Sequence, residues 1–171
     1  ANTGALGHGL AIAVGMAMGI RLDEGDSRVY VIMGDGELAE GSNWEAIAAA
    51  AHYKLSNLCV FVDFNGLQIS GRVQDIMNFT PFKERFEAFG WNVITIDGHD
   101  MKQIVEALEM ARVAVDRPTV IVAHTIKGKG IPFLEGKAAS HFWSPNEGEL
   151  DEAVKSIKIK AGLQEGKGYD W

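Results

Sequence analysis

An apolar run that stops abruptly at a glycine–aspartate–glycine turn constrains the fold of this chain more than any other feature. Residues 28–33 (RVYVIM) are rich in β-branched side chains and too few to span a membrane, so they predict a buried strand of the parallel type. A helical stretch over residues 43–54 and a second apolar strand over residues 58–63 follow. A right-handed crossover would lay the two strands parallel, ending at one edge of the sheet. The sequence therefore predicts an α/β fold, a mostly parallel sheet with helices on both faces.

The ends of these two strands carry residues suited to a metal ion. Asp35 follows the first strand and Asn65 follows the second, so both are expected to face one crevice at the edge where open α/β sheets bind ligands. A carboxylate and an amide oxygen suit Mg²⁺, a small hard cation that usually binds together with a phosphorylated ligand. Gly34 and Gly36 let an anion approach the backbone, and a helix beginning near Ser42 directs its positive end to the same place. This pattern predicts a site for a metal ion and a diphosphate.

At these residues the chain resembles the transketolase family. The motif GDGELAEG (residues 34–41), the Glu45 that follows it, and DFNGLQISG (residues 63–71) are similar to the thiamine diphosphate-binding domain of that family. The resemblance implies thiamine diphosphate as the cofactor and Mg²⁺, or alternatively Ca²⁺ or Mn²⁺, as its metal ion. It also implies the fold of thiamine diphosphate-binding domains.

The first residues match the same family. NTGALGHG (residues 2–9) is similar to a segment whose glycine and leucine touch the cofactor, which implicates Gly4 and Leu6. The alternative for both is a tightly packed start of the helix expected over residues 6–20. A longer stretch precedes this segment in the family. We therefore expect residues 1–171 to form one N-terminally incomplete domain, as a fragment or as a separate subunit.

The resemblance implies a role for each matching residue. Asp35, the side chain of Asn65 and the backbone carbonyl of Leu67 would ligate the metal ion. Glu40 matches a glutamate of the cofactor site. Glu45 matches a glutamate near the dimer interface that contacts the catalytic carboxylate of the partner. The alternative for both glutamates is an electrostatic role in the first turn of a helix.

Two further candidates follow a predicted strand over residues 117–123. The segment HTIKGKG (residues 124–130) opens at the same edge of the sheet and matches the family pattern Thr-x-Lys-Gly-x-Gly. Lys127 would pair with the diphosphate, and His141 resembles a histidine that reaches the diphosphate and the reacting end of the substrate. Alone, such a glycine-rich segment is equally compatible with a solvated turn.

Local patterns predict the remaining elements. Asp97 and His99 are expected to serve a turn, although the pair could mimic a metal or acid–base site. We expect a turn-rich loop over residues 65–71, a helix with an aromatic stripe within residues 79–90 and a strand over residues 91–96. A capping box of Asp100 and Gln103 predicts a helix through residue 115. The last helix is expected to be capped at Ser144, with Pro145 at its first position and Glu147 reaching back, and to run through about residue 161, before a loose tail over residues 164–171.

Composition excludes several classes of protein. The 171 residues fit one domain, and 16 basic against 23 acidic residues, with no basic cluster, argue against nucleic-acid binding. The only cysteine, Cys59, is expected to be a buried apolar residue. The sequence has no apolar run near 18 residues and no signal-like start, so we expect no membrane association and a cytoplasmic location.

The resemblance implies a transferase of carbohydrate metabolism, as in the pentose phosphate pathway. In that family the cofactor carries a two-carbon ketol unit from a ketose phosphate to an aldose phosphate. The activating glutamate belongs to a pyrimidine-binding domain supplied by a partner, within a homodimer or an α2β2 heterotetramer. Nothing in the chain matches that domain, so activity is expected only with a partner.

Three alternatives share parts of these motifs. The thiamine-dependent subunit of a 2-oxo-acid dehydrogenase shares the GDG turn and the later asparagine, but TIKGKG and DGHD favour transketolase. A deoxyxylulose-phosphate synthase fits less well, because Glu40 and Gly41 follow the transketolase pattern. A non-catalytic assembly subunit that retains the fold is the alternative from another class.

Overall fold

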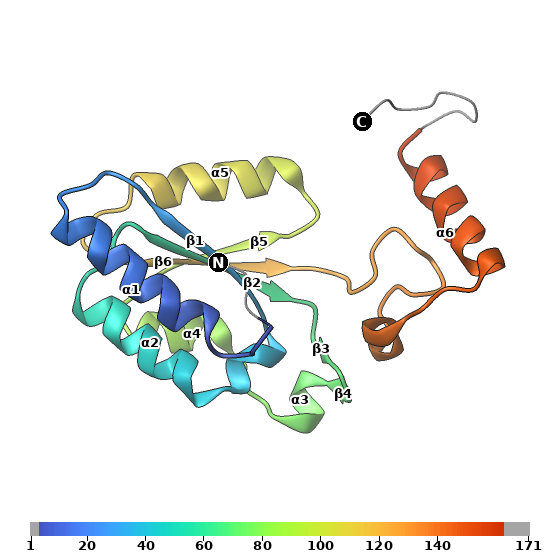
Figure 1. Ribbon diagram of the computed structural model, residues 1–171, viewed down its shortest axis with the longest axis horizontal. Helices are drawn as coiled ribbons and strands as arrows, with labels where there is room; N and C mark the ends of the chain where they lie inside the picture. Colours follow the sequence, from blue (N-terminus) through green and yellow to red (C-terminus); the bar gives the residue numbers. More distant parts are fainter. Residues whose placement is uncertain (1–3, 163–171) are drawn as a thin grey trace.

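The computed structural model describes residues 4–162 and centres on a four-stranded parallel sheet (Figure 1). The strand order is β1-β2-β6-β5, and every neighbouring pair is parallel. The strands are β1 (Val29–Gly34), β2 (Leu58–Phe64), β6 (Thr119–His124) and β5 (Asn92–Asp97). The predicted parallel sheet and its four strands are confirmed, with boundaries shifted by one or two residues.

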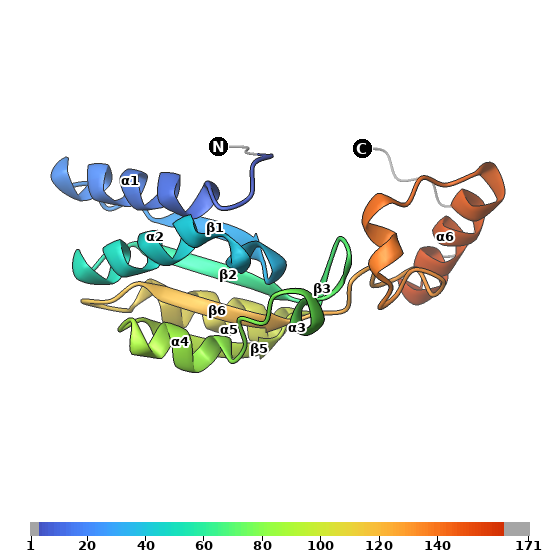
Figure 2. The ribbon, with the colours of Figure 1, turned by 90° about the horizontal axis from the view of Figure 1, so that it is seen from below.

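Helices cover both faces of the sheet, as predicted (Figure 2). One face packs against α1 (Gly9–Leu22), α2 (Gly41–His52) and α4 (Phe82–Ala88), and the other against α5 (Met101–Arg112). Strand β2 shows the cause: Val60 faces the first three helices, whereas Cys59 faces α5. Because successive side chains of a strand point to opposite faces, its continuous apolar run fills two cores.

The aromatic stripe of α4 is mostly core. Phe82 and Phe86 are buried, and the Phe86 ring meets Trp91 edge-on at a centroid distance of 5.5 Å. Phe89 lies just beyond the helix, 37% exposed, with its ring against Trp44. The stripe therefore packs α4 against the sheet.

Several predicted helix boundaries are wrong in detail: the helix expected over residues 6–20 spans 9–22, and the one expected over 43–54 spans 41–52. Asn146, not Ser144, caps α6 (Glu147–Lys160): its side chain accepts from the backbone of Glu149, whose carboxylate accepts from the backbone of Asn146. This reciprocal pair satisfies two backbone donors, which Ser144 and Glu147 do not. Helix α5 does begin at an Asp100 cap, but it ends at Arg112 rather than at residue 115.

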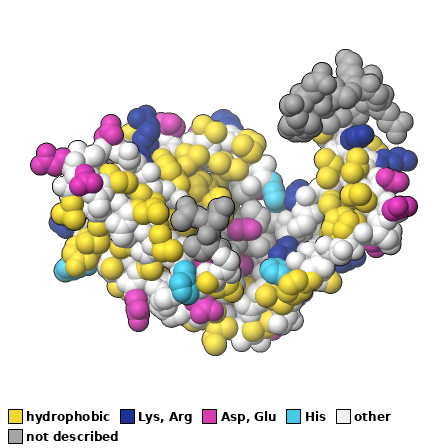
Figure 3. Space-filling view, in the orientation of Figure 1, with side chains coloured by type: hydrophobic (Ala, Val, Ile, Leu, Met, Phe, Trp, Pro, Cys, Tyr) yellow, Lys and Arg dark blue, Asp and Glu magenta, His cyan; other side chains and the backbone are white. Residues whose placement is uncertain are grey.

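Short elements gather at the carboxyl edge of the sheet. The predicted loop over residues 65–71 contains a small antiparallel hairpin. The chain after β6 forms a lobe beyond the sheet, made of a loop, η2 and α6, and Figure 3 shows the surface hollowed between this lobe and the body. The tail over 164–171 lies outside the described residues. The short elements are η1 (Gly36–Ala39), β3 (Leu67–Gln68), β4 (Gly71–Arg72), α3 (Val73–Ile76) and η2 (Ala138–Phe142).

Candidate functional site

The strand register brings the predicted loops to one edge. Gly34 of β1 is level with Asp63 of β2, which is level with Ala123 of β6. The chain leaves all three strands side by side there, and the hairpin and the segment leading to the lobe begin at this edge (Figure 1). The prediction that the first two strands end together is confirmed.

Asp35 and the residues around Asn65 are in direct contact. The Asp35 carboxylate accepts hydrogen bonds from the backbone N–H of Gly66, at 2.6 Å, and of Gly36, at 2.8 Å. The backbone N–H of Asp35 donates to the Asp63 carbonyl at 3.2 Å. The turn after β1 is thereby joined to the loop after β2, with Asp35 at the centre.

Asp35 is a buried acid without a cationic partner in the described part of the chain. Its exposure is 1%, and no ion pair among residues 4–162 involves it. Burial raises the pKa of the carboxyl, and the neighbouring charge of Asp63 raises it further, against the lowering effect of the Gly66 and Gly36 hydrogen bonds. A buried carboxylate in this position favours a bound cation.

The hairpin lies directly on the glycine–aspartate–glycine turn. A Cβ placed on Gly36 would lie 2.7 Å from the Cβ of Gln68, so only glycine fits beneath β3. A Cβ on Gly34 would meet nothing within 4 Å. The Asn65 side-chain oxygen accepts from the Leu67 backbone N–H at 3.0 Å and keeps a second lone pair. Asn65 and Leu67 therefore flank Gly66, whose backbone N–H binds the Asp35 carboxylate.

The segment after β6 is tied to the end of β2. The Thr125 hydroxyl donates to the Asp63 carboxylate, and the Thr125 backbone N–H donates to the Phe64 carbonyl at 3.1 Å. Farther from the sheet, the backbone N–H of Ile126 donates to Nε2 of His99 at 2.8 Å. Asp97 and His99 do serve a turn, since the Asp97 carboxylate accepts from the His99 backbone, but the imidazole has this additional partner. No local pattern signals that long-range bond.

Lys127 and His141 meet across the lobe. The Lys127 ammonium lies 3.3 Å from Nδ1 of His141. An ammonium can only donate, so Nδ1 is the acceptor in this contact. The loop around His141 thus places this side chain next to Lys127.

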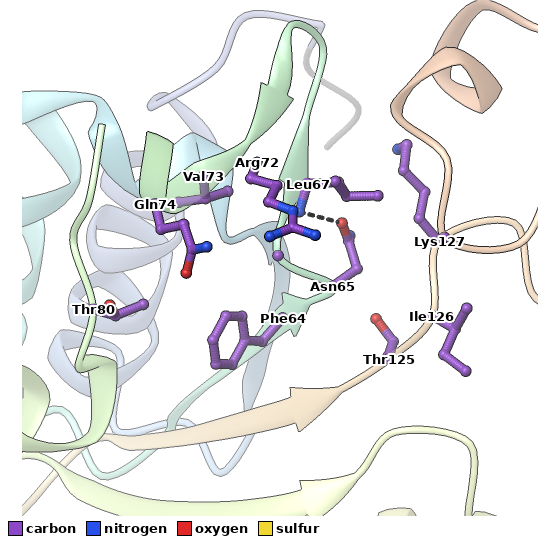
Figure 4. Close-up of a pocket in the computed structure, with 12 residues that line it drawn as sticks. Phe64, Asn65, Leu67, Arg72, Val73, Gln74, Thr80, Thr125, Ile126 and Lys127 are labelled. Carbon is purple, nitrogen blue, oxygen red and sulfur yellow. Dashed lines mark hydrogen bonds between the residues drawn. The ribbon is translucent and has the colours of Figure 1, made fainter. Parts of the chain in front are cut away.

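A cavity of about 420 Å³ opens between the hairpin of β3 and β4 and the segment that follows β6 (Figure 4). Asn65 and Leu67 line it from the β2 side, and Lys127 lies on the opposite side. Arg72 also lines the cavity, from β4, a position that the sequence analysis did not single out. The cavity therefore lies between one predicted metal-ligand loop and the predicted diphosphate-pairing lysine.

Gly4 and Leu6 lie in an exposed segment, with Leu6 55% exposed. The following Gly7 has φ +76°, and both its peptide groups are bound: its N–H donates to Glu37 and its carbonyl accepts from the Ser42 hydroxyl. Glu37 was missed by the sequence analysis. An acid inside the turn motif, without a nearby basic residue in the sequence, was the available signal.

The two other glutamates are less connected. Glu40 is the N-cap residue of α2, is exposed, and makes no side-chain capping bond. Glu45 is exposed in the next turn and takes no part in the hydrogen bonds that join the other candidates within residues 4–162. The structure thus brings Asp35, Asn65 and Leu67 together and pairs Lys127 with His141, while Glu45 stands apart.

The described residues contain neither a cluster of metal-ligating side chains nor a membrane-spanning helix. Between residues 4 and 162 no group of three or more His, Cys, Asp or Glu side chains is placed to hold a metal ion. In the same range no helix is long and apolar enough to cross a membrane.

Comparison with known proteins identifies similar chains. Residues 1–169 match the family described as transketolase, thiamine diphosphate binding domain. The chain is 42% identical over 156 residues to one subunit of the apulose-4-phosphate transketolase of Phocaeicola vulgatus, covering 91% of this chain and 56% of that protein. It is 46% identical over 157 residues to a 6-deoxy-6-sulfo-D-fructose transketolase subunit of a Clostridium species, covering 92% of this chain and 57% of that protein.

A solved structure has the same fold. The crystal structure of transketolase from Campylobacter jejuni superposes with a TM-score of 0.87 at 36% sequence identity, covering 98% of this chain and 27% of that chain. The chain thus spans about half the length of the curated relatives it matches and about a quarter of that solved structure.

Proposed function

The chain belongs to the transketolase family, as its thiamine diphosphate-binding domain, and from this premise we propose that it binds thiamine diphosphate with Mg²⁺ in a two-subunit transketolase. The observation that carries the proposal is Asp35, a buried carboxylate held by Gly36 and Gly66 beside Asn65. Its burial and the adjacent charge of Asp63 leave an excess of negative charge that a divalent cation would offset.

The described residues fit such a group. Asp35, the Asn65 side-chain oxygen and the Leu67 carbonyl would hold the metal ion, and the diphosphate would lie against the backbone of Gly34. Gly36, predicted to join it, lies beneath Gln68 of the hairpin and donates its N–H to Asp35. Hard oxygen donors of this kind are those that Mg²⁺ takes together with phosphate oxygens. Open space above Gly34 leaves room for an anion at the backbone.

The other candidates take their proposed roles from position. Lys127 would balance the diphosphate charge, and His141, paired with it at 3.3 Å, would serve the reacting end of the substrate. Gly4 and Leu6 would flank the cofactor rings, with Glu40 nearby in the cofactor site. When bound, thiamine diphosphate supplies the nucleophilic carbon, so these residues bind, orient and exchange protons rather than forming covalent bonds.

We propose a partner that supplies a pyrimidine-binding domain. Two relatives are named as transketolase subunits, and the chain covers little more than half of each. Exposed Glu45 would contact the catalytic carboxylate of that partner, in a homodimer or an α2β2 heterotetramer. The substrates would be a ketose phosphate and an aldose phosphate, and the expected cytoplasmic location remains a prediction.

Calorimetric titration of thiamine diphosphate with Mg²⁺ tests the binding proposal. We expect binding that requires Mg²⁺, that Asp35→Ala abolishes, and that the pyrimidine-domain partner tightens. Asp151→Ala, an exposed acid on α6, is the matched control and should bind as the wild type does. Equal binding by wild type and Asp35→Ala would refute the assignment of the metal ligand.

A substrate assay with the partner present tests the reaction. Transfer of a ketol unit from xylulose 5-phosphate to an aldose phosphate would support the proposal. Decarboxylation of pyruvate with a dye as electron acceptor would instead identify a 2-oxo-acid dehydrogenase subunit. Cofactor binding with neither reaction would favour an assembly role.

A further inference from the structure

One carboxylate joins two segments that are far apart in the sequence. The backbone N–H of Gly7 donates to Oε1 of Glu37 at 3.0 Å, and the backbone N–H of Gly34 donates to Oε2 at 3.3 Å. Gly7 follows the segment of Gly4 and Leu6, whereas Gly34 begins the glycine–aspartate–glycine turn. Glu37 therefore bridges the part of the chain assigned to the cofactor rings and the part assigned to the diphosphate.

Gly7 is held from its other side as well. The Ser42 hydroxyl donates to the Gly7 carbonyl at 2.7 Å. A Cβ on Gly7 would lie 2.6 Å from that hydroxyl oxygen and 2.7 Å from the Cβ of Glu40, and its φ of +76° also favours glycine. The residue is buried and closely packed between η1 and the start of α2.

The two bridged segments differ in their other supports. The turn is held independently of Glu37, because Asp35 bonds to Gly36, Gly66 and the Asp63 carbonyl. The segment before Gly7 has no comparable support within the described residues: a Cβ on Gly4 would meet nothing within 4 Å, and Leu6 is half exposed. Its carbonyl at Leu6 accepts only a local bond from Nδ1 of His8.

We propose that Glu37 is a positioning residue that fixes the ring-binding segment relative to the diphosphate turn. This inference rests on the proposed function, since it assigns one end of thiamine diphosphate to each segment. Glu37 itself touches neither end. Because the turn keeps its own supports, removing one acceptor from Glu37 releases mainly the ring-binding segment.

Glu37→Gln is the discriminating variant. Glutamine has nearly the same shape, but an NH₂ group replaces one of the two carboxylate oxygens, so one of the two N–H groups faces a donor in place of its acceptor. We expect the affinity for thiamine diphosphate with Mg²⁺ to fall about 10-fold, and that for inorganic diphosphate with Mg²⁺ to fall less than about 3-fold. Ser42→Ala, which frees the Gly7 carbonyl, should show the same ligand dependence. Glu106→Gln, an exposed residue of α5, should change neither affinity.

Amide hydrogen exchange provides a readout that needs no cofactor. In Glu37→Gln the Gly7 amide should exchange about 10-fold faster, while amides of β2 keep their wild-type rates. Unchanged Gly7 exchange, or an equal loss of affinity for both ligands, would overturn the proposal. A wild-type protein that binds neither ligand would overturn the proposed function instead, and the Gly7 exchange would still decide whether Glu37 holds this segment.

Discussion

The Asp35 carboxylate lies 2.6 Å from the backbone nitrogen of Gly66, so the turn after β1 and the loop after β2 share one hydrogen bond at the edge of the sheet. Adjacent strands in a parallel sheet do not by themselves fix their loops relative to each other. Here the Asp35 carboxylate fixes the two loops by binding Gly66. Gly66 directly follows Asn65, the residue with which Asp35 would share a metal ion.

The raised pKa of Asp35 makes metal binding pH-dependent. Burial first, and then the charge of Asp63, raise the pKa of this carboxyl above its usual 3.8. Protons therefore compete with Mg²⁺ for this carboxylate in acidic solution, and we expect the affinity to rise with pH and to level off above the raised pKa. Calorimetric titrations at a series of pH values from neutral down to 3.8 measure this.

The raised pKa of Asp35 also makes the stability of the metal-free protein depend on pH. Because the folded pKa exceeds the unfolded one, the contribution of Asp35 to stability is fully present at low pH and is lost as the pH rises through the folded value. Asp35→Asn should remove this dependence together with metal binding. A Mg²⁺ affinity that stays constant as the pH falls to 3.8 would contradict the assignment.

Two glycines of one motif should respond differently to alanine. Gly36→Ala places a Cβ 2.7 Å from that of Gln68, so the hairpin must shift, and we expect a loss of about 1–3 kcal/mol in the free energy of unfolding. Gly34→Ala meets nothing within 4 Å and should keep the wild-type stability while weakening the binding of inorganic diphosphate. Urea unfolding and calorimetry separate the two effects, and equal destabilisation by both changes would refute this account.

His99 should hold the segment that carries Lys127. Its Nε2 accepts from the Ile126 backbone, and His99→Phe preserves a ring while removing the acceptor. Loss of one hydrogen bond is worth about 1 kcal/mol, so we expect about a 5-fold weaker affinity for thiamine diphosphate with Mg²⁺. His52→Phe, exposed at the end of α2, is the control. Unchanged affinity together with unchanged exchange of the Ile126 amide would exclude this role.

Cys59 should be unreactive in the folded protein. Burial raises the pKa of its thiol from 9.0 to about 11, despite the opposing charge of Arg28. At pH 8 the thiolate is then about 0.1% of the folded population, against roughly 10% in unfolded chains. We expect alkylation by iodoacetamide to be at least 100-fold slower than in urea. Rapid labelling under native conditions would show that the α5 face opens.

The main features of the fold were predictable because they depend on local patterns. The apolar run before Gly34 and the run before Asn65 fixed two neighbouring parallel strands, and the crossover rule placed Asp35 and Asn65 together. The cap at Asp100 was also readable from sequence. The N-cap residue of the last helix could not be identified in this way, because Ser144 and Asn146 both have side-chain oxygens. Only the reciprocal hydrogen bonds with Glu149 identify Asn146 as the cap.

The bonds that stabilise the site were less predictable. Glu37 and His99 each bind a backbone N–H that is 27 or more positions away in sequence, and periodicity carries no information about such pairs. The hairpin of β3 and β4 was expected as a loop because each strand has only two residues. Arg72 was missed for the same reason, since its place beside the cavity follows from that hairpin.

The pairing of β2 with β6 also determines when this site can form during folding. Cys59 pairs with Thr119, and the intervening chain contains β3, β4, α3, α4, β5 and α5. Contacts that close such a long loop form late, because the loop's entropy must be lost before they contribute. Asn65 and Lys127 lie just beyond the two paired strands, so the cavity that both residues line forms only after this closure. During synthesis, the candidate site would therefore assemble only after β6 has emerged from the ribosome.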